Sequence, residues 1–234
     1  DSFEHAKRFK DVISSKETPV RFIGVWDTVS SVLIPHPKRL LGIKEQKLPY
    51  TATNPGVEIF RQAIAIDEKR SMFRVNFWNE SQKYNLNRFD NGKDDKDQDI
   101  KQIWFAGYHG DVGGGFPELE SGIAKFPLKW MVDEARNAGL RINTAMFNHL
   151  VLGKERANST RSYVAPDAAA KIHDSLDLLW RLVNKLVGYK SRLISEGAYI
   201  HSSVIERMTS TPEYRPANLP DKDGIKEKYK ITDG

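Results

Sequence analysis

The chain has 234 residues, of which 39% are hydrophobic, and its 36 Lys and Arg against 31 Asp and Glu give a net charge of +5. A chain of this length and composition can bury a full core, and no apolar run approaches the ~20 residues that cross a bilayer, so the disordered and membrane-spanning classes are excluded. Cysteine is absent, which excludes disulfide scaffolds and thiolate metal sites.

The first half of the chain alternates between apolar runs and polar connections. The spacing of apolar residues predicts an amphipathic helix over Ser2–Ile13, and the β-branched and aromatic run Val20–Trp26 predicts a buried strand. Prolines punctuate residues 30–56, which indicates a long irregular loop of the kind that often forms a lid or a binding loop. Gly56–Phe73 has helix-like apolar spacing. The highly charged segment 87–101 is typical of a solvated loop or hairpin tip rather than a metal site.

The second half predicts one more strand and then helices. Ile103–Gly107 is a second buried apolar run. Pro127–Ala138 predicts a helix with proline near its start and glycine just past its end, and a shorter helical run covers Asn143–Leu152. A further helix over Asp174–Val187 carries a wide apolar stripe, which favours a core position and leaves a docking face as the alternative. Strands separated by helical segments predict an α/β fold with a mostly parallel sheet.

A polar side chain follows each of the two predicted strands. Asp27 comes directly after the first strand, and His109 comes just after the second. Asp27 could pair with a cation, orient a histidine, or cap the next turn through Thr28 and Ser30. His109 could be a structural residue or a base. Since functional groups collect at the carboxyl ends of parallel strands, and since a buried carboxylate that accepts the Nδ1 proton of an imidazole leaves Nε2 as a general base, the pair favours a Ser-His-Asp type of chemistry.

The glycines and the basic residues carry weaker signals. The sequence GDVGGG lacks both the Lys-Ser/Thr of a phosphate loop and the spacing of a dinucleotide fingerprint, so no nucleotide cofactor is expected. The basic groups KRFK, HPKRLLGIK and KDGIKEKYK are scattered and lack interleaved aromatic residues, so no nucleic-acid partner is expected. No signal-peptide pattern is present, and the expected location is the cytoplasm or an exported state.

Several motifs together resemble one known family. In chain order they are VRFIGVWDTVSSV, AIAIDEKRSMF, IWFAGYHGDVGGGF, LKWMVDEARNAGL and the late YIHSSVIERM with YRPANLP. They cover most of the chain from Val20 to about Pro220 and are similar to the α/β-hydrolase domain family that includes the type VI secretion lipase effectors, which act as phospholipases. The resemblance implies that Asp27 is the acid and His109 the base of a triad, and that the substrate is a lipid or another carboxylic ester. Transient contact with a membrane surface is compatible with the basic charge.

The serine of such a triad is missing from its usual setting, the G-x-S-x-G turn between a strand and a helix. The candidate serines lack flanking glycines; they are Ser14, Ser15, Ser30, Ser31, Ser202 and Ser203. We therefore expect residues 1–234 to be the C-terminal part of an α/β-hydrolase-like domain whose nucleophile-bearing part lies upstream. Residues 1–140 are expected to form a sheet-and-helix core with the acid and the base, and residues 141–234 a mainly helical lid or appendage. On this hypothesis the fragment alone is inactive.

Alternatives remain for the base and for the function. His201 is a rival base, and Asp111 is expected to brace the glycine turn through backbone amides. His109 and Asp111 could instead contribute metal ligands, although a pair two residues apart is a weak metal signal. The favoured function is ester hydrolysis by acyl transfer through serine, and the alternative is a non-catalytic binding or structural module of the same fold. The remaining histidines are expected to be surface or packing residues: His5, His36, His149 and His173.

Overall fold

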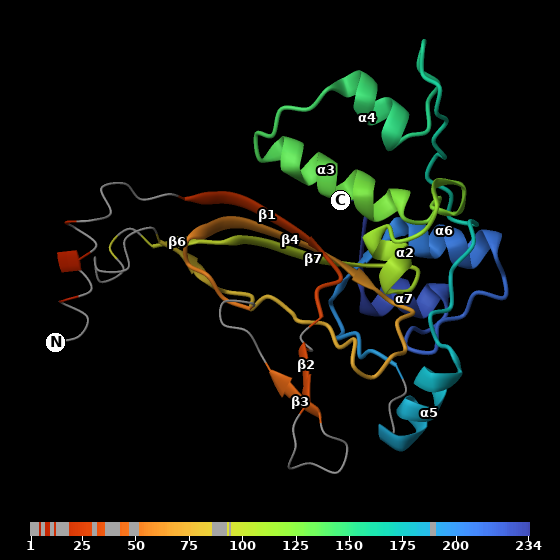
Figure 1. The fold of residues 1–234 in the computed structure, drawn as a ribbon, viewed down its shortest axis with the longest axis horizontal. Helices are drawn as coiled ribbons and strands as arrows, with labels where there is room; N and C mark the ends of the chain where they lie inside the picture. The colour runs from red at the N-terminus through yellow and green to blue at the C-terminus, as the bar shows by residue number, and fades with distance from the viewer. Residues whose placement is uncertain are drawn as a thin grey trace.

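The computed structural model describes residues 5, 8–9, 12, 19–29, 32–35, 43–46, 52–85, 93, 95–187 and 191–234. The helix expected over Ser2–Ile13 falls largely outside these residues. At the centre of the fold is a five-stranded sheet in the order β1-β4-β7-β8-β9, and every neighbouring pair is parallel. Figure 1 shows β1, β4 and β7 side by side. The prediction of an α/β fold with a mostly parallel sheet is confirmed. The strands of this sheet are β1 (Val20–Trp26), β4 (Val57–Ala65), β7 (Asp99–Phe105), β8 (Tyr199–His201) and β9 (Lys230–Thr232).

Strand β4 lies between β1 and β7, in a segment whose spacing predicted a helix. The helical prediction for Gly56–Phe73 is therefore wrong. A strand that is covered on both faces is apolar almost throughout, so the alternation that marks a half-buried strand is absent. Its two central polar residues have partners elsewhere: Arg61 forms an ion pair with Glu134, and Gln62 donates a hydrogen bond to Thr28 Oγ1 at 2.7 Å. These partners lie far away in the sequence, so a local sequence pattern cannot predict them.

Successive side chains of β4 and β7 enter two cores on opposite faces of the sheet. Helix α3 (Lys125–Asn137) lies along one face (Figure 1). The core on this face contains Ala63, Ala65, Ile103, Phe105, Trp130 and Met131. Helices α6 (Ser202–Ser210) and α7 (Lys222–Lys228) contribute to the other core. That core contains Ile64, Trp104, Ile200, Val204, Met208 and Ile225. The two cores fix the sheet between helices and so fix the positions of its strand ends.

Two short hairpins extend from this framework. Within residues 30–56, which were expected to be an irregular loop, β2 (Val32–Pro35) and β3 (Ile43–Gln46) pair antiparallel and project away from the sheet (Figure 1). Strand β5 (Lys83–Tyr84), just before the charged segment 87–101, pairs antiparallel with β6 (Lys96–Asp97), which lies within that segment, in agreement with the hairpin alternative. The first hairpin is therefore a correction to the loop prediction, and the second agrees with its pattern.

Residues 141–234 contribute to the sheet as well as to the helices. Helix α4 (Thr144–Leu150) lies within the predicted run 143–152. Strand β8 pairs with β7, and β9 pairs with β8, so the sheet continues beyond residue 140. No helix in the described part of the chain has the length and apolar character that crossing a bilayer requires.

Helix α5 (Leu178–Val187) begins later than predicted and has an open side. The stripe expected to enter the core comprised Leu176, Leu179, Trp180, Val183 and Leu186; of these, Leu186 is 70% exposed, whereas Leu176, Trp180 and Val183 are half-buried. Leu178 and Leu182, which lie outside that stripe, are 84% and 57% exposed. Asn184 on the opposite side is buried and accepts a hydrogen bond from the backbone N–H of Ser71 at 3.0 Å. The core expectation is therefore wrong for Leu186, and the helix is attached in part through a buried polar residue.

Candidate active site

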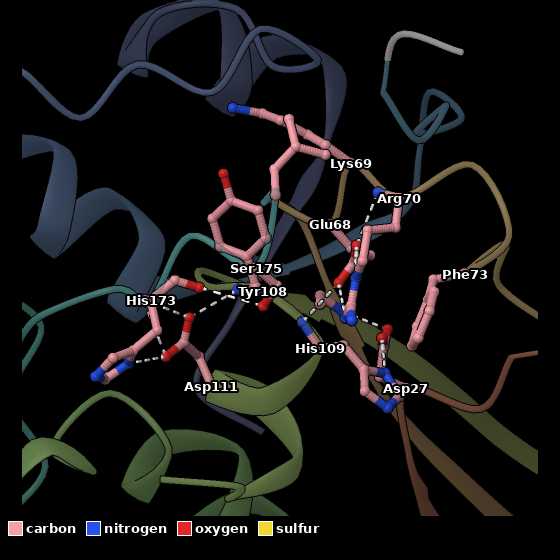
Figure 2. A network of polar contacts seen from close by, with 12 residues as sticks. Asp27, Glu68, Lys69, Arg70, Phe73, Tyr108, His109, Asp111, His173 and Ser175 are labelled. Carbon is pink, nitrogen blue, oxygen red and sulfur yellow. Dashed lines mark hydrogen bonds and ion pairs between the residues drawn. The ribbon is translucent and has the colours of Figure 1, made fainter. Parts of the chain in front are cut away.

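The candidate site forms where β1 and β7 end. Because these strands and β4 are parallel, their carboxyl ends meet at one edge of the sheet, which is where α/β proteins usually bind ligands. Asp27 directly follows β1, and its N–H donates to the carbonyl of Ala63 in β4 at 2.7 Å. His109 is the first residue of the short helix α2 (His109–Gly113), which comes soon after β7. The two side chains converge at this edge (Figure 2).

Asp27 and His109 form a short hydrogen-bonded pair. Nδ1 of His109 lies 2.6 Å from Oδ2 of Asp27, which is fully buried, whereas the His109 side chain is 34% exposed. Burial opposes ionisation of Asp27, but the hydrogen bond with His109 and the charge and hydrogen bonds of Arg192 outweigh it and lower the pKa of this carboxyl. No described residue forms a hydrogen bond with Nε2 of His109. The partly exposed imidazole is therefore anchored through one nitrogen and has the other available.

The backbone at Asp27 is unusual and is held by β4. Its φ of 44° lies in the left-handed region, which costs a non-glycine residue of the order of 1 kcal/mol or more and is found most often at functional sites. Oδ1 of Asp27 accepts a hydrogen bond from the N–H of Ala65 at 2.9 Å. The carboxylate therefore points across the sheet edge, and its bonds to His109 and Ala65 replace the cap of its own turn that was one sequence-based alternative.

A sharp turn carries the chain from β7 to His109. Gly107 has a φ of 116°, and a Cβ there would lie only 2.6 Å from Cβ of Asp111, so only glycine fits. Oδ2 of Asp111 accepts a hydrogen bond from the N–H of Tyr108 at 2.9 Å. Asp111 thus braces the turn, as its position in the sequence suggested.

Two acidic residues that follow β4 hold the same turn from the other side. The N–H of Gly107 donates to Oδ2 of Asp67 at 2.7 Å, and the N–H of His109 donates to Oε2 of Glu68 at 3.2 Å. Burial raises the pKa of Asp67 to about 6, against the opposing effect of its hydrogen bonds from Gly107 and Tyr214. The backbone that positions the imidazole is therefore held at the amides of Gly107 and His109, on either side of Tyr108, by two carboxylates of the loop that follows β4.

Comparison with protein families gives a match that includes both members of the pair. Residues 1–134 match the T6SS phospholipase effector Tle1-like catalytic domain. The chain belongs to this family. No curated protein and no solved structure matches the chain. The resemblance inferred from the motifs is thereby confirmed, and membership of the Tle1-like family indicates lipase or phospholipase function.

Part of the candidate site was missed by the sequence analysis. The motif AIAIDEKRSMF supports the family resemblance, but its Glu68, Arg70 and Phe73 were given no role. Nε and Nη2 of Arg70 each lie 2.8 Å from a carboxylate oxygen of Glu68, and the guanidinium carbon lies 3.6 Å from the centre of the Phe73 ring. The Phe73 ring meets His109 edge-on at 5.3 Å between ring centres (Figure 2). The dense charge of the motif was its one local signal.

Arg192 also contacts the pair and lies beyond the residues matched to the Tle1-like family. Its guanidinium contacts both oxygens of Asp27. Nothing in the sequence around Arg192 distinguishes it from the other scattered basic residues, so no local pattern could have identified it.

The rival base, His201, has a different role in the structure. It ends β8 and precedes α6, and its Nδ1 accepts a hydrogen bond from the N–H of Ser203 at 3.1 Å. Burial lowers the pKa of His201 to about 4, and its ring stacks on Phe105 at 4.6 Å between centres. None of its described contacts is with Asp27. His201 is thus a helix cap within a core.

Asp111 and His109 do not share a ligand position. Asp111 faces His173, whose Nδ1 lies 2.7 Å from Oδ1 of Asp111, whereas His109 faces Asp27 (Figure 2). Burial opposes protonation of His173, but its hydrogen bonds to Asp111 and Glu120 raise its pKa above the ordinary value. Over the part of the chain that is described, no group of three or more His, Asp and Glu residues could hold a metal ion.

Proposed function

We propose that this protein is a serine-type hydrolase of carboxylic esters, acting as a phospholipase, in which His109 is the general base and Asp27 the orienting acid. The observation that carries the proposal is the 2.6 Å contact between Nδ1 of His109 and the buried carboxylate of Asp27. This contact supports an imidazole with its proton on Nδ1 and with Nε2 free to accept a proton.

The residues support acyl transfer in two steps. The hydroxyl oxygen of a serine attacks the ester carbonyl carbon, and its proton passes to Nε2 of His109. The same proton then goes to the departing alcohol as the ester C–O bond breaks, which leaves the acyl group on the serine. A water molecule, deprotonated by His109, releases the acid and restores the serine. Asp27 stabilises the transient imidazolium throughout.

The serine is proposed to lie on a segment upstream of this chain. The outer edge of β1 pairs with no other strand in the described part of the chain. A further parallel strand at this edge would end beside Asp27, which is where a nucleophile on a strand-to-helix turn can reach His109. Among the described serines, none forms a hydrogen bond with His109. The position of the open edge favours an upstream strand as the source.

Labelling with a fluorophosphonate probe tests this proposal. The probe reacts with serine only when a base activates its hydroxyl. We expect the full-length protein to be labelled at one serine upstream of Asp27, and we expect heat-unfolded protein to remain unlabelled. A folded protein that stays unlabelled, and that releases no fatty acid from phospholipid vesicles, would instead support the non-catalytic module.

The exposed side of α5 is proposed to contact the lipid surface. Leu178, Leu182 and Leu186 are spaced so that they share one side of the helix, and Arg181 and Lys185 line the same open groove as the first two leucines. A helix with leucines on one side and basic residues beside them is suited to the interface of an anionic bilayer. The helix itself contains no acidic residue that would repel such a surface.

The inner side of α5 connects this surface to the site. Trp180 meets Phe73 edge-on at 5.9 Å between ring centres, and Phe73 in turn contacts His109. Nδ2 of Asn184 donates to the carbonyl of Lys69 at 2.5 Å. The helix is therefore attached to the loop that borders the imidazole, and a lipid surface that binds the leucines would lie close to the base.

Replacing two of these leucines should weaken binding to vesicles. We expect the double variant Leu178→Ser/Leu186→Ser of the full-length protein to bind vesicles of phosphatidylcholine and phosphatidylglycerol at least tenfold more weakly, because each leucine that enters the interface contributes of the order of 1 kcal/mol. The control is Leu119→Ser/Leu140→Ser, which removes similarly exposed leucines elsewhere. Flotation of vesicles measures the binding. Equal affinities for the two double variants would show that α5 does not contact the lipid.

A further inference from the structure

The carboxylate of Asp27 is held from two sides. His109 approaches Oδ2, and on the other side Arg192 forms a two-pronged ion pair, with Nη1 at 2.5 Å from Oδ1 and Nη2 at 3.0 Å from Oδ2. Both members of this ion pair are buried, since their side chains are 3% and 0% exposed. With the N–H of Ala65, these donors occupy both oxygens of the carboxylate.

Arg192 is itself fixed by the backbone around the site. Its Nη1 donates to the carbonyl of Ala65 at 2.8 Å, and its Nη2 donates to the carbonyl of Phe73 at 2.6 Å. The carbonyl of Arg192 accepts a hydrogen bond from Nδ2 of Asn218 at 3.1 Å, and Nδ2 also donates to the carbonyl of Ile66 at 3.0 Å. The guanidinium therefore joins the end of β4 to the loop that presents Phe73 to the imidazole.

This arrangement has two chemical consequences for the pair. A planar guanidinium with two parallel hydrogen bonds fixes the plane of a carboxylate, so that Oδ2 of Asp27 is directed at Nδ1 of His109. A full positive charge beside the carboxylate also offsets part of the negative charge that His109 experiences. The imidazolium formed during the reaction then faces an ion pair rather than an isolated anion. It is stabilised less than it would be by a lone carboxylate, so it returns its proton to the leaving group more readily.

We propose that Arg192 is a positioning residue of this hydrolase, which orients the Asp27 carboxylate toward His109 and sets the charge beside the imidazole. The inference rests on the proposed function of the pair. Arg192 lies outside residues 1–134, the region that matches the family model, so the later part of the chain completes the acid of the site. That part of the chain is needed for chemistry as well as for contact with substrate.

The test compares three variants of the full-length protein by the pH dependence of ester turnover. We expect Arg192→Gln to lower kcat by about 100-fold, as expected for a misplaced catalytic group, and to move the acid limb of the profile upward by about one pH unit. Arg192→Lys keeps the charge and loses the fork, so it should leave the acid limb in place and recover only part of kcat. The charged groups that face His109, namely Asp27, Glu68 and Arg70, are unchanged in all variants.

Arg207 provides a matched control. It is equally buried and donates to the carbonyls of Ala168 and Ala170 at 2.6 and 2.7 Å, without a described contact to Asp27. We expect Arg207→Gln to lower stability while the acid limb stays at its wild-type pH. If Arg192→Gln moves the acid limb no more than Arg207→Gln does, the positioning role is wrong. If Arg192→Gln does not fold, Arg192→Lys decides, because wild-type kcat in that variant equally overturns the proposal.

A second readout separates this inference from the proposed function. In protein labelled with ¹⁵N-histidine, the Nδ1 proton of His109 should give a strongly downfield NMR signal that shifts in Arg192→Gln and stays in place in Arg207→Gln. This signal reports the Asp27–His109 contact whether or not the protein hydrolyses esters. If the wild-type protein does not hydrolyse esters but the signal still shifts in Arg192→Gln, only the proposed function is wrong. An unshifted signal in Arg192→Gln would remove the positioning role alone.

Discussion

Replacement of His109 by alanine is expected to reduce ester turnover by about 10⁶-fold, close to the rate that binding and oxyanion stabilisation supply without a base. The reason is that the proposed mechanism assigns proton transfer to Nε2 of His109, whose Nδ1 lies 2.6 Å from Oδ2 of Asp27. The measurement is kcat on phospholipid vesicles and on a short-chain ester, together with fluorophosphonate labelling, which the variant should lose. The imidazole is partly exposed, so we expect the variant to remain folded.

His201→Asn is the matched control for this loss. Asparagine can accept the hydrogen bond from the N–H of Ser203 and so keep the cap of α6. Activity should therefore stay within about tenfold of wild type, the loss being limited to the weaker stacking on Phe105. If His109→Ala retained turnover and His201→Asn abolished it, the assignment of the base would pass to His201.

The two strand ends could be predicted from sequence because their signals are local. Val20–Trp26 and Ile103–Gly107 are short apolar runs, and Asp27 and His109 follow them at once. Parallel strands bring their carboxyl ends to one edge, so the proximity of the two side chains follows from topology rather than from their separation in sequence. The structure brings Nδ1 of His109 to 2.6 Å from Oδ2 of Asp27.

The parts that sequence reasoning missed depend on contacts between distant segments. β4 looked helical because its polar residues, Arg61 and Gln62, find their partners in α3 and after β1, which leaves no alternation in the strand itself. Arg192 contacts Asp27 across most of the chain and is preceded by no motif. Leu186, a member of the apolar stripe predicted for the core, is exposed, because a periodic apolar pattern gives the side of a helix but not what covers it.

The substitution Asp27→Asn should lower turnover by about 10⁴-fold, as expected when a base is held in the wrong tautomer. An amide has one donor end, and both ends of the Asp27 side chain face donors: Ala65 and Arg192 at one oxygen, His109 and Arg192 at the other. Fewer donors oppose one another when the NH₂ of the introduced asparagine faces His109, because the imidazole can move its proton from Nδ1 to Nε2 and then accept a hydrogen bond at Nδ1. That tautomer cannot accept a proton from serine. Turnover and the pH dependence of kcat measure the loss, and activity within tenfold of wild type would contradict the role of the acid.

The same substitution should also destabilise the fold, because it leaves the buried guanidinium of Arg192 without its counterion. Breaking such a pair costs about 3–5 kcal/mol in the free energy of unfolding, whereas removing both charges costs much less. The double variant Asp27→Asn/Arg192→Gln should therefore recover part of the stability lost in Asp27→Asn, as measured by urea unfolding, and should recover none of the turnover. Recovery of stability and activity together would mean that the carboxylate serves the fold alone. Recovery of stability without activity would mean that the ion pair is maintained for the chemistry of His109.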